Sequence, residues 1–182
     1  MNITNGDRVC LRWWERKDRR AIAHWPASEV PAHWVQAAAP VQGDNRVSIA
    51  VVLAHNAFLV GRITMRDIRD GGATVGIYLH PGHKGKGYGR ESIALLCRYL
   101  FQVVGLELVR MDVAIDNERA IACYRAVQFQ TVGSENRDGH VYLQMERRSA
   151  SYPLVSGYHR GGHRDIRVLF PADGYDGNRA GR

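Results

Sequence analysis

The fold is decided by the stretch Leu79-His80-Pro81-Gly82-His83-Lys84-Gly85-Lys86-Gly87-Tyr88-Gly89, which joins an apolar strand to an amphipathic helix. Its alternating glycines leave several backbone N–H groups unshielded directly before the positive end of a helix. Such a site suits an anion, above all a diphosphate. Lys84, Lys86 and Arg90 add mobile positive charge around it. The alternative is an ordinary glycine-rich turn with solvated lysines, because glycine spacing alone is a weak signal.

The stretch does not match the sequence motifs of two familiar phosphate-binding loops. The stretch lacks the G-x-x-x-x-G-K-[ST] of a P-loop, and its glycines do not follow the G-x-G-x-x-G of a dinucleotide-binding fold. The anion site therefore belongs to another class of fold.

Regular elements are expected on both sides of this turn. Apolar residues at spacings of three and four predict a helix over 87–104, which Gly105 ends. The other helices are expected at 17–23, 30–39 and 118–127, and strands at 9–12, 47–53, 58–65, 74–79, 108–115, 130–133 and 141–146. This order predicts an α/β (α+β) domain in which helices flank a mixed sheet.

A second motif lies about 30 residues downstream of the turn: Asn117-Glu118-Arg119-Ala120-Ile121-Ala122-Cys123-Tyr124. Together, the turn and this motif resemble the acetyl-CoA motifs of the GNAT superfamily of N-acetyltransferases, whose Gln/Arg position is taken here by Lys84. The resemblance covers roughly residues 9–147 and is strongest over 76–129. It implies a GNAT-like, mostly antiparallel central sheet of about seven strands with about four helices.

The resemblance also implies roles for individual residues. The backbone at Ile77 and Leu79 would pair with the pantetheine arm of acetyl-CoA, and Lys84 through Arg90 would hold its pyrophosphate. Asn117 would contact the cofactor arm, and the Tyr124 phenol would lie near the sulfur and protonate the departing thiolate. Burial of Tyr124 as an ordinary core residue is the simpler explanation of its spacing alone.

The general base is less well defined. Many similar enzymes that acetylate protein N-termini carry a glutamate where this chain has Thr74, which cannot accept a proton. Asp112 is the candidate replacement, because certain similar aminoglycoside N-acetyltransferases have an aspartate five residues before the same asparagine. An aspartate hydrogen-bonded within the sheet is equally expected. His80, His83 and a chain of water molecules are further alternatives.

The composition of the chain indicates its domain organisation, its location and the role of its cysteines. The 182 residues are 45% hydrophobic and 24% charged, which indicates a single globular domain over 1–148, followed by a basic tail over 149–182 that is partly flexible or adds a strand. The start lacks a secretory pattern and no apolar stretch could span a membrane, so a cytoplasmic protein is expected. The three cysteines lack metal-ligand spacing and indicate reduced packing residues without a metal.

The expected activity is transfer of acetyl from acetyl-CoA to a primary amine of a protein N-terminus or small molecule, in a protein that could form a homodimer. Trp13, Trp14, Trp25 and Trp34 are candidate walls of the acceptor pocket, although most are expected in the core. A non-catalytic acyl-CoA sensor is the first alternative. A nucleic-acid-binding module is the second and less favoured one, suggested by the net charge of +7 and by the tail residues 158–164.

Overall fold

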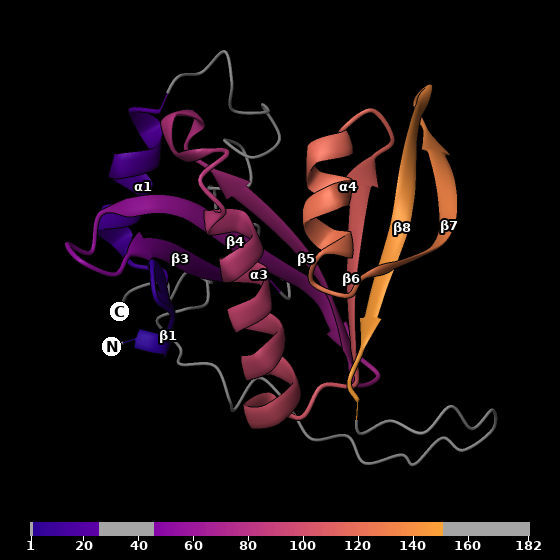
Figure 1. The fold of residues 1–182 in the computed structure, drawn as a ribbon, viewed down its shortest axis with the longest axis horizontal. Helices are drawn as coiled ribbons and strands as arrows, with labels where there is room; N and C mark the ends of the chain where they lie inside the picture. The colour runs from indigo at the N-terminus through magenta and orange to yellow at the C-terminus, as the bar shows by residue number, and fades with distance from the viewer. Residues whose placement is uncertain (1, 26–45, 151–182) are drawn as a thin grey trace, which may run out of the picture.

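A single sheet runs through the described part of the protein. The structure is a computed structural model that describes residues 2–25 and 46–150. Its strands lie in the order β1-β2-β3-β4-β5-β6-β8-β7, and only β5 and β6 run parallel to each other. Figure 1 shows α3 and α4 in front of this sheet, with α1 at the far end of it. The expected mixed, mostly antiparallel sheet with flanking helices is therefore confirmed.

The N-terminal half of the sheet is an antiparallel run of five strands. These strands are β1 (Asn2–Asn5), β2 (Val9–Trp13), β3 (Val47–Leu53), β4 (Leu59–Arg69) and β5 (Gly72–Leu79). The strand β1 was not expected, because its sequence Asn-Ile-Thr-Asn is polar and short, and its pairing with β2 is what makes it a strand. The sheet therefore has eight strands where about seven were expected.

The C-terminal half contains three strands. They are β6 (Leu108–Ala114), β7 (Gln130–Arg137) and β8 (His140–Arg148), and the last two form a hairpin that turns at Asp138 and Gly139. Both hairpin strands extend beyond the ranges expected from sequence, because polar residues near the turn continue the antiparallel pairing.

The α-helices of the described residues are α1 (Arg16–Ala23), α3 (Tyr88–Tyr99) and α4 (Glu118–Arg125). A short 3-10 turn, η1 (Pro81–His83), precedes the glycine-rich turn, and the single helix expected over 87–104 ends in a π-helical segment, η2 (Leu100–Val104). The expected helix 30–39 and the tail beyond residue 150 lie outside the described residues.

The sheet has two apolar faces. The larger core packs α3 and α4 against alternate strand residues, including Val75 of β5 and Met111 of β6. A smaller core on the opposite face holds Trp14, Trp25 and Tyr78 beside α1. Because strand side chains alternate between faces, this division fixes which residues of β5 and β6 lie on each side.

The two halves of the sheet meet along a short ladder. Strands β5 and β6 pair over only three residues, from Gly72 opposite Leu108 to Thr74 opposite Arg110. Beyond Thr74 the two strands diverge, as Figure 1 shows, and continue separately to Leu79 and Ala114. The divergence leaves two strand edges facing each other without hydrogen bonds between them.

Candidate active site

The facing strand edges present free backbone groups. The N–H of His80 donates to Val60 of β4, so the alternate residues Ile77 and Leu79 direct their N–H and C=O groups to the other side, toward β6. On β6, the N–H of Ile115 donates to β8, which leaves the backbone of Asp112 facing β5. An extended amide-containing chain inserted here can hydrogen-bond to both edges.

The glycine-rich turn lies at the wide end of this divergence. Gly85 and Gly87 have φ values of +82° and +79°, which favour glycine, and Gly87 precedes the first residue of α3. No side chain caps this helix start, and the N–H groups of Tyr88, Gly89 and Arg90 have no partner among the described residues. The turn is therefore a row of free donors at the positive end of a helix.

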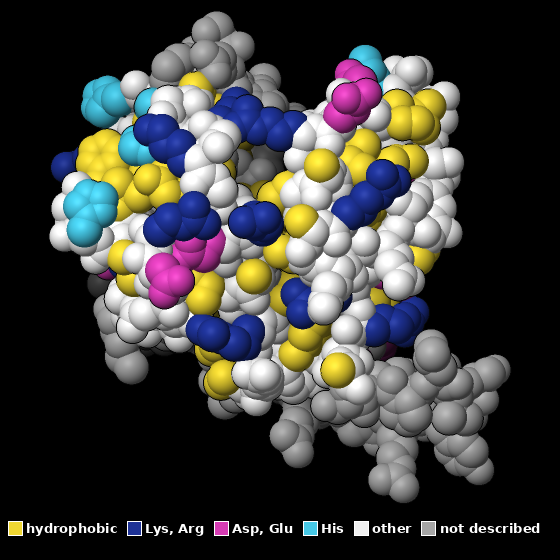
Figure 2. Space-filling model, in the orientation of Figure 1, with side chains coloured by type: hydrophobic (Ala, Val, Ile, Leu, Met, Phe, Trp, Pro, Cys, Tyr) yellow, Lys and Arg dark blue, Asp and Glu magenta, His cyan; other side chains and the backbone are white. Residues whose placement is uncertain are grey.

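Cationic side chains come both from this turn and from distant positions, and the Lys84 Nζ lies 5.5 Å from the centroid of the Tyr78 ring. Lys84, Lys86 and Arg90 come from the turn and α3 itself, as the sequence indicated. Arg8 and Arg119 come from distant positions: a Cβ atom added at Gly87 would lie 2.8 Å from Arg8 Nη1, and one added at Gly85 would lie 2.7 Å from Arg119 Nη2. Figure 2 shows lysine and arginine side chains gathered beside the hollow between the two halves of the molecule.

Arg8 is held in place by a carboxylate. Its Nε donates to Glu91 Oε2 at 2.8 Å, and its Nη1 donates to the Lys86 carbonyl at 2.9 Å. Burial disfavours ionisation of Glu91, but hydrogen bonds from the Arg8 backbone and guanidinium and from the Val9 N–H outweigh it and lower the Glu91 pKa. Arg8 and Glu91 thus fix the shape of the turn.

Tyr124 lies on α4 and packs into the larger core. Its side chain is 7% exposed and contacts the Phe129 ring, with centroids 6.1 Å apart. Burial, with a smaller contribution from Cys123, raises the Tyr124 pKa, so the phenol is protonated at neutral pH. Its hydroxyl has no hydrogen-bond partner among the described residues. A buried phenol without a protein partner is a donor available to a ligand.

Asn117 has a structural role at the start of α4. Its Oδ1 accepts the N–H of Ala120 at 3.1 Å, which caps the helix. Its backbone N–H donates to Ala114, at the end of β6. The side-chain amide nitrogen is not used by the cap.

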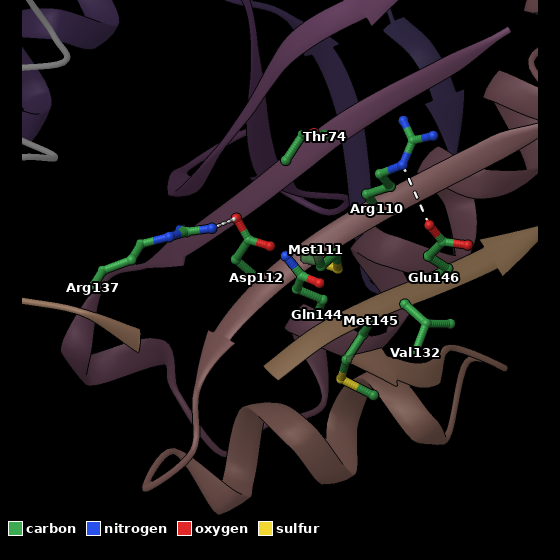
Figure 3. Close-up of a pocket in the computed structure, with 9 residues that line it drawn as sticks. All are labelled: Thr74, Arg110, Met111, Asp112, Val132, Arg137, Gln144, Met145 and Glu146. Atoms are coloured by element: carbon green, nitrogen blue, oxygen red, sulfur yellow. Dashed lines mark hydrogen bonds and ion pairs between the residues drawn. The ribbon is translucent and has the colours of Figure 1, made fainter. Parts of the chain in front are cut away.

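Asp112 lies on the opposite face of β6 from the Tyr124 core, because its neighbours Met111 and Val113 belong to that core. Its Oδ2 accepts from Arg66 at 3.1 Å and from Arg137 at 3.0 Å, as Figure 3 shows for Arg137. Its Oδ1 has no partner among the described residues. The structure thus brings the backbone of Asp112 to the divergence from one side and its carboxylate to the other face.

A polar hollow of about 280 Å³ lies beside Asp112. Figure 3 shows that residues of β5, β6, β7 and β8 line it, among them Thr74, the last paired residue of β5. A neighbouring hollow shares Thr74 and Arg110 with it. These hollows are on the face away from α3 and α4, so a second reactant can approach the divergence from the side opposite the glycine turn.

The two histidines considered as bases lie at η1. His80 Nδ1 accepts the Gly82 N–H at 3.1 Å, so the neutral ring carries its proton on Nε2 and has no lone pair free for a substrate proton. Burial, then the charges of Lys86 and His80, lower the His83 pKa. Its ring packs between Phe58 and Tyr88 on the outer side of the turn.

The other candidate wall and packing residues have ordinary positions. Trp14 and Trp25 are buried in the smaller core, Trp13 packs partly buried against the larger one, and Trp34 lies outside the described residues. Cys10 and Cys97 are buried, and Cys123 is half-buried beside Gly89. Burial raises the Cys97 pKa to about 11, which keeps that thiol unreactive. Cys10 and Cys97 therefore pack in the interior, as expected.

The family is decided by sequence comparison. Residues 5–130 match the family model described as an acetyltransferase (GNAT) domain, which is well over half of the chain. This chain belongs to the GNAT acetyltransferase family. No curated protein matches it significantly.

The fold of this GNAT protein is shared with solved structures. A spermidine N-acetyltransferase from Vibrio cholerae in complex with CoA and spermine has a TM-score of 0.64 and 20% identity, covering 79% of this chain and 96% of that one. A dodecameric spermidine N-acetyltransferase from Vibrio cholerae in an intermediate state has a TM-score of 0.66 and 22% identity, covering 84% and 100%. At these identities the likeness shows the fold.

Family membership confirms two expectations for this GNAT protein. The activity is acetyl transfer to an amine, and the cosubstrate is acetyl-CoA.

No helix among the described residues is long and apolar enough to cross a membrane. The described residues also contain no group of three or more histidines, cysteines and carboxylates that could hold a metal ion.

Two residues beside the glycine-rich turn were not singled out from the sequence. Arg119 lies inside the second motif but was treated as a spacer, and its charge beside Gly85 was a detectable signal. Arg8 gave no signal in the sequence. It directly precedes β2, and only the pairing of β2 within the sheet brings Arg8 to the start of α3.

Proposed function

We propose that this chain transfers the acetyl group of acetyl-CoA to a primary amine of a small molecule or a protein N-terminus by direct attack on the thioester. One observation carries the proposal: free backbone groups at Ile77 and Leu79 lead directly to the uncapped, cation-ringed start of α3. An extended arm that ends in a diphosphate matches both features. Acetyl-CoA has this shape.

The cofactor residues follow from this fit. Ile77 and Leu79 would pair with the pantetheine arm, and the turn from Lys84 to Arg90, Gly89 included, would hold the diphosphate with the help of Arg8 and Arg119. The Asn117 amide nitrogen, which the helix cap leaves free, would contact the arm. Acetyl-CoA supplies the acetyl group as a thioester that a neutral amine can attack.

Tyr124 would act as the acid. Its raised pKa keeps the phenol protonated, and its hydroxyl lacks a protein partner. An ordinary thiol has a pKa of about 8.5, so Tyr124 is the weaker acid of the two. Its contribution is therefore greatest as a hydrogen-bond donor while negative charge develops on the departing sulfur. A free N–H at Ile77 or Leu79 would stabilise the carbonyl oxyanion.

Asp112 would receive the proton of the attacking amine. Its free Oδ1 lies beside the polar hollow, on the face opposite the cofactor turn. Arg66 and Arg137 hold the carboxylate in one position through Oδ2. Thr74, beside it, offers a hydroxyl that can orient an amine without accepting its proton.

The charged residues that line the hollow beside Asp112 affect which amine acceptors can bind there. Among the described residues that line it, Asp112 and Glu146 each pair with arginines. Glu135, nearby on β7, also pairs with Arg137. A polyamine would have to displace these arginines, so acceptors with a single amine fit this surface better than spermidine, which the structurally similar enzymes acetylate.

The test is thiol release from acetyl-CoA with a panel of amines: peptides with free N-termini, an aminoglycoside, spermidine, spermine and simple primary amines. Turnover with any member supports acetyl transfer, and its identity sets the acceptor class. Binding of acetyl-CoA without turnover on any member would contradict catalysis and favour an acyl-CoA sensor.

Variants assign the two catalytic roles. Tyr124→Phe should lower kcat at least about 100-fold and leave acetyl-CoA affinity unchanged, whereas Tyr99→Phe, a half-buried tyrosine outside the site, should do neither. Asp112→Asn should lower kcat/KM strongly. The matched variant Glu135→Gln, which also loses a contact to Arg137, should leave kcat/KM nearly unchanged.

A further inference from the structure

An exposed aromatic ring lies beside the glycine turn. Phe58, in the turn between β3 and β4, is 54% exposed and is one of four exposed large apolar residues in the described part of the chain. Its backbone is fixed: its N–H donates to Asn56 Oδ1 at 3.0 Å, and its carbonyl accepts the Leu53 N–H at 2.9 Å. The ring is thus held at the surface by a rigid turn.

Phe58 continues into a row of rings that reaches α3. Its centroid is 5.7 Å from that of His83, with 38° between the planes, and His83 is 6.2 Å from Tyr88 at 34°. His80 supports His83 from the side, with centroids 5.5 Å apart. The rings thus form a continuous row from the turn between β3 and β4 to the first residue of α3.

The middle ring of this row is uncharged at neutral pH. Burial, then Lys86 and His80, lower the His83 pKa, so its imidazole is an aromatic surface without a positive charge. Tyr88 begins α3, and its N–H is one of the free donors of the turn. The row of rings and the anion-binding turn therefore share a residue.

We propose that Phe58, His83 and Tyr88 form an aromatic platform that holds the adenine ring of acetyl-CoA. This inference rests on the proposed function, since it needs the diphosphate at the turn. A purine offers two flat faces and stacks on aromatic side chains without needing hydrogen bonds to its edges. Lys86, close enough to affect the His83 pKa, would lie beside the ribose and its phosphate.

The platform predicts a difference between two acetyl donors. Acetyl-CoA carries the adenine nucleotide, whereas S-acetyl-4′-phosphopantetheine has the same arm and thioester without it. Phe58→Ala should weaken acetyl-CoA binding about tenfold in calorimetric titration and leave binding of S-acetyl-4′-phosphopantetheine unchanged. Phe58→Trp should restore acetyl-CoA binding, because it restores a stacking surface.

Val103→Ala is the matched control. Val103 is 68% exposed on η2, beyond the other end of α3, and its truncation should change neither affinity. A direct readout comes from CoA with etheno-modified adenine, whose fluorescence is quenched when the base stacks. Wild-type protein should quench it, and Phe58→Ala should quench it less.

The outcomes separate this inference from the proposed function. Equal weakening of both donors, or no weakening of either, would overturn the platform even though the wild-type protein binds and uses acetyl-CoA. If the wild-type protein neither binds nor uses acetyl-CoA, the proposed function fails, and the platform fails with it.

Discussion

The starts of α1 and α3 are built in opposite ways. At α1, the Asp18 carboxylate is 2% exposed, accepts the Glu15 N–H at 2.8 Å and forms a two-bond pair with Arg12 at 2.7 Å per bond. At α3, the residue before the helix is Gly87, no side chain caps the helix, and the surrounding charges are positive. A helix start closed by its own carboxylate cannot accept an anion, whereas one left open and ringed by cations can.

This contrast separates stability from binding. The carboxylate at α1 serves the fold, and its removal should affect folding alone. The open start of α3 leaves polar groups for a ligand to satisfy. Changes at the two helix starts should therefore give different signatures in unfolding and in titration with acetyl-CoA.

The largest effect is expected from Asp18→Ala. It would leave the Arg12 guanidinium, 9% exposed as a residue, with only its longer ion-pair contact to Glu15 at 3.5 Å, and breaking a buried ion pair from one side costs about 3–5 kcal/mol. Thermal unfolding should shift down by roughly 10 °C. Lys17→Ala, which breaks an exposed pair with Glu15, should cost about 1 kcal/mol or less. Similar losses in both variants would contradict a special role for the Asp18 pair.

Gly87→Ala should mainly weaken binding. A non-glycine residue at a φ of +79° costs about 1–2 kcal/mol, and the new methyl group would displace Arg8 from the turn. Acetyl-CoA affinity should fall by about tenfold or more in calorimetric titration. Gly105→Ala is the control, because its φ is +81° and its added Cβ would meet nothing within 4 Å. It should lose comparable stability and keep its affinity.

A smaller effect is expected at the start of α4. Asn117→Ala removes the cap and should lower the free energy of unfolding by about 1 kcal/mol. Asn117→Ser restores a capping oxygen but not the amide nitrogen. If Asn117 contacts acetyl-CoA, Asn117→Ser should recover stability without recovering affinity; recovery of both would leave the residue with a structural role only.

The smallest effect concerns Glu91 and depends on pH. Its pKa is lowered in the folded protein, so its contribution to stability is present above the ordinary value of 4.5 and is lost as the pH falls through the lowered value. Glu91→Gln should reduce stability at pH 7 by about 0.5–1 kcal/mol. Denaturant titrations should show the two proteins converging at acid pH. A constant difference down to the lowest pH would exclude this ion pair as the cause.

The fold was largely predictable because its signals are local. Alternating apolar residues marked the strands, and spacings of three and four marked the helices around the glycine turn. The strand β1 was not predictable, because only pairing with β2 makes Asn2–Asn5 a strand. The π-helical end of α3 also left no pattern distinct from a regular helix.

The candidate site could be proposed from sequence where one segment carries it. The turn and the strand before it were singled out from their own residues and from the family resemblance. Arg8 could not be found, since its position depends on strand pairing across the sheet. The ion pairs of Asp112 with Arg66 and Arg137 join residues 46 and 25 positions away along the chain, and no spacing rule connects them.

The short ladder between β5 and β6 has a mechanical consequence. Among the described residues, a ladder of three residue pairs and the bonds from Glu107 and Leu108 to the Gly71 carbonyl join two half-sheets of five and three strands. We therefore expect partial unfolding to begin by separation of β5 from β6. Amide hydrogens beside this ladder should exchange with solvent sooner than those within either half-sheet. A molecule bound along the free edges of both strands would act as a ninth, removable strand. Its binding should slow amide hydrogen exchange in β5 and β6 together.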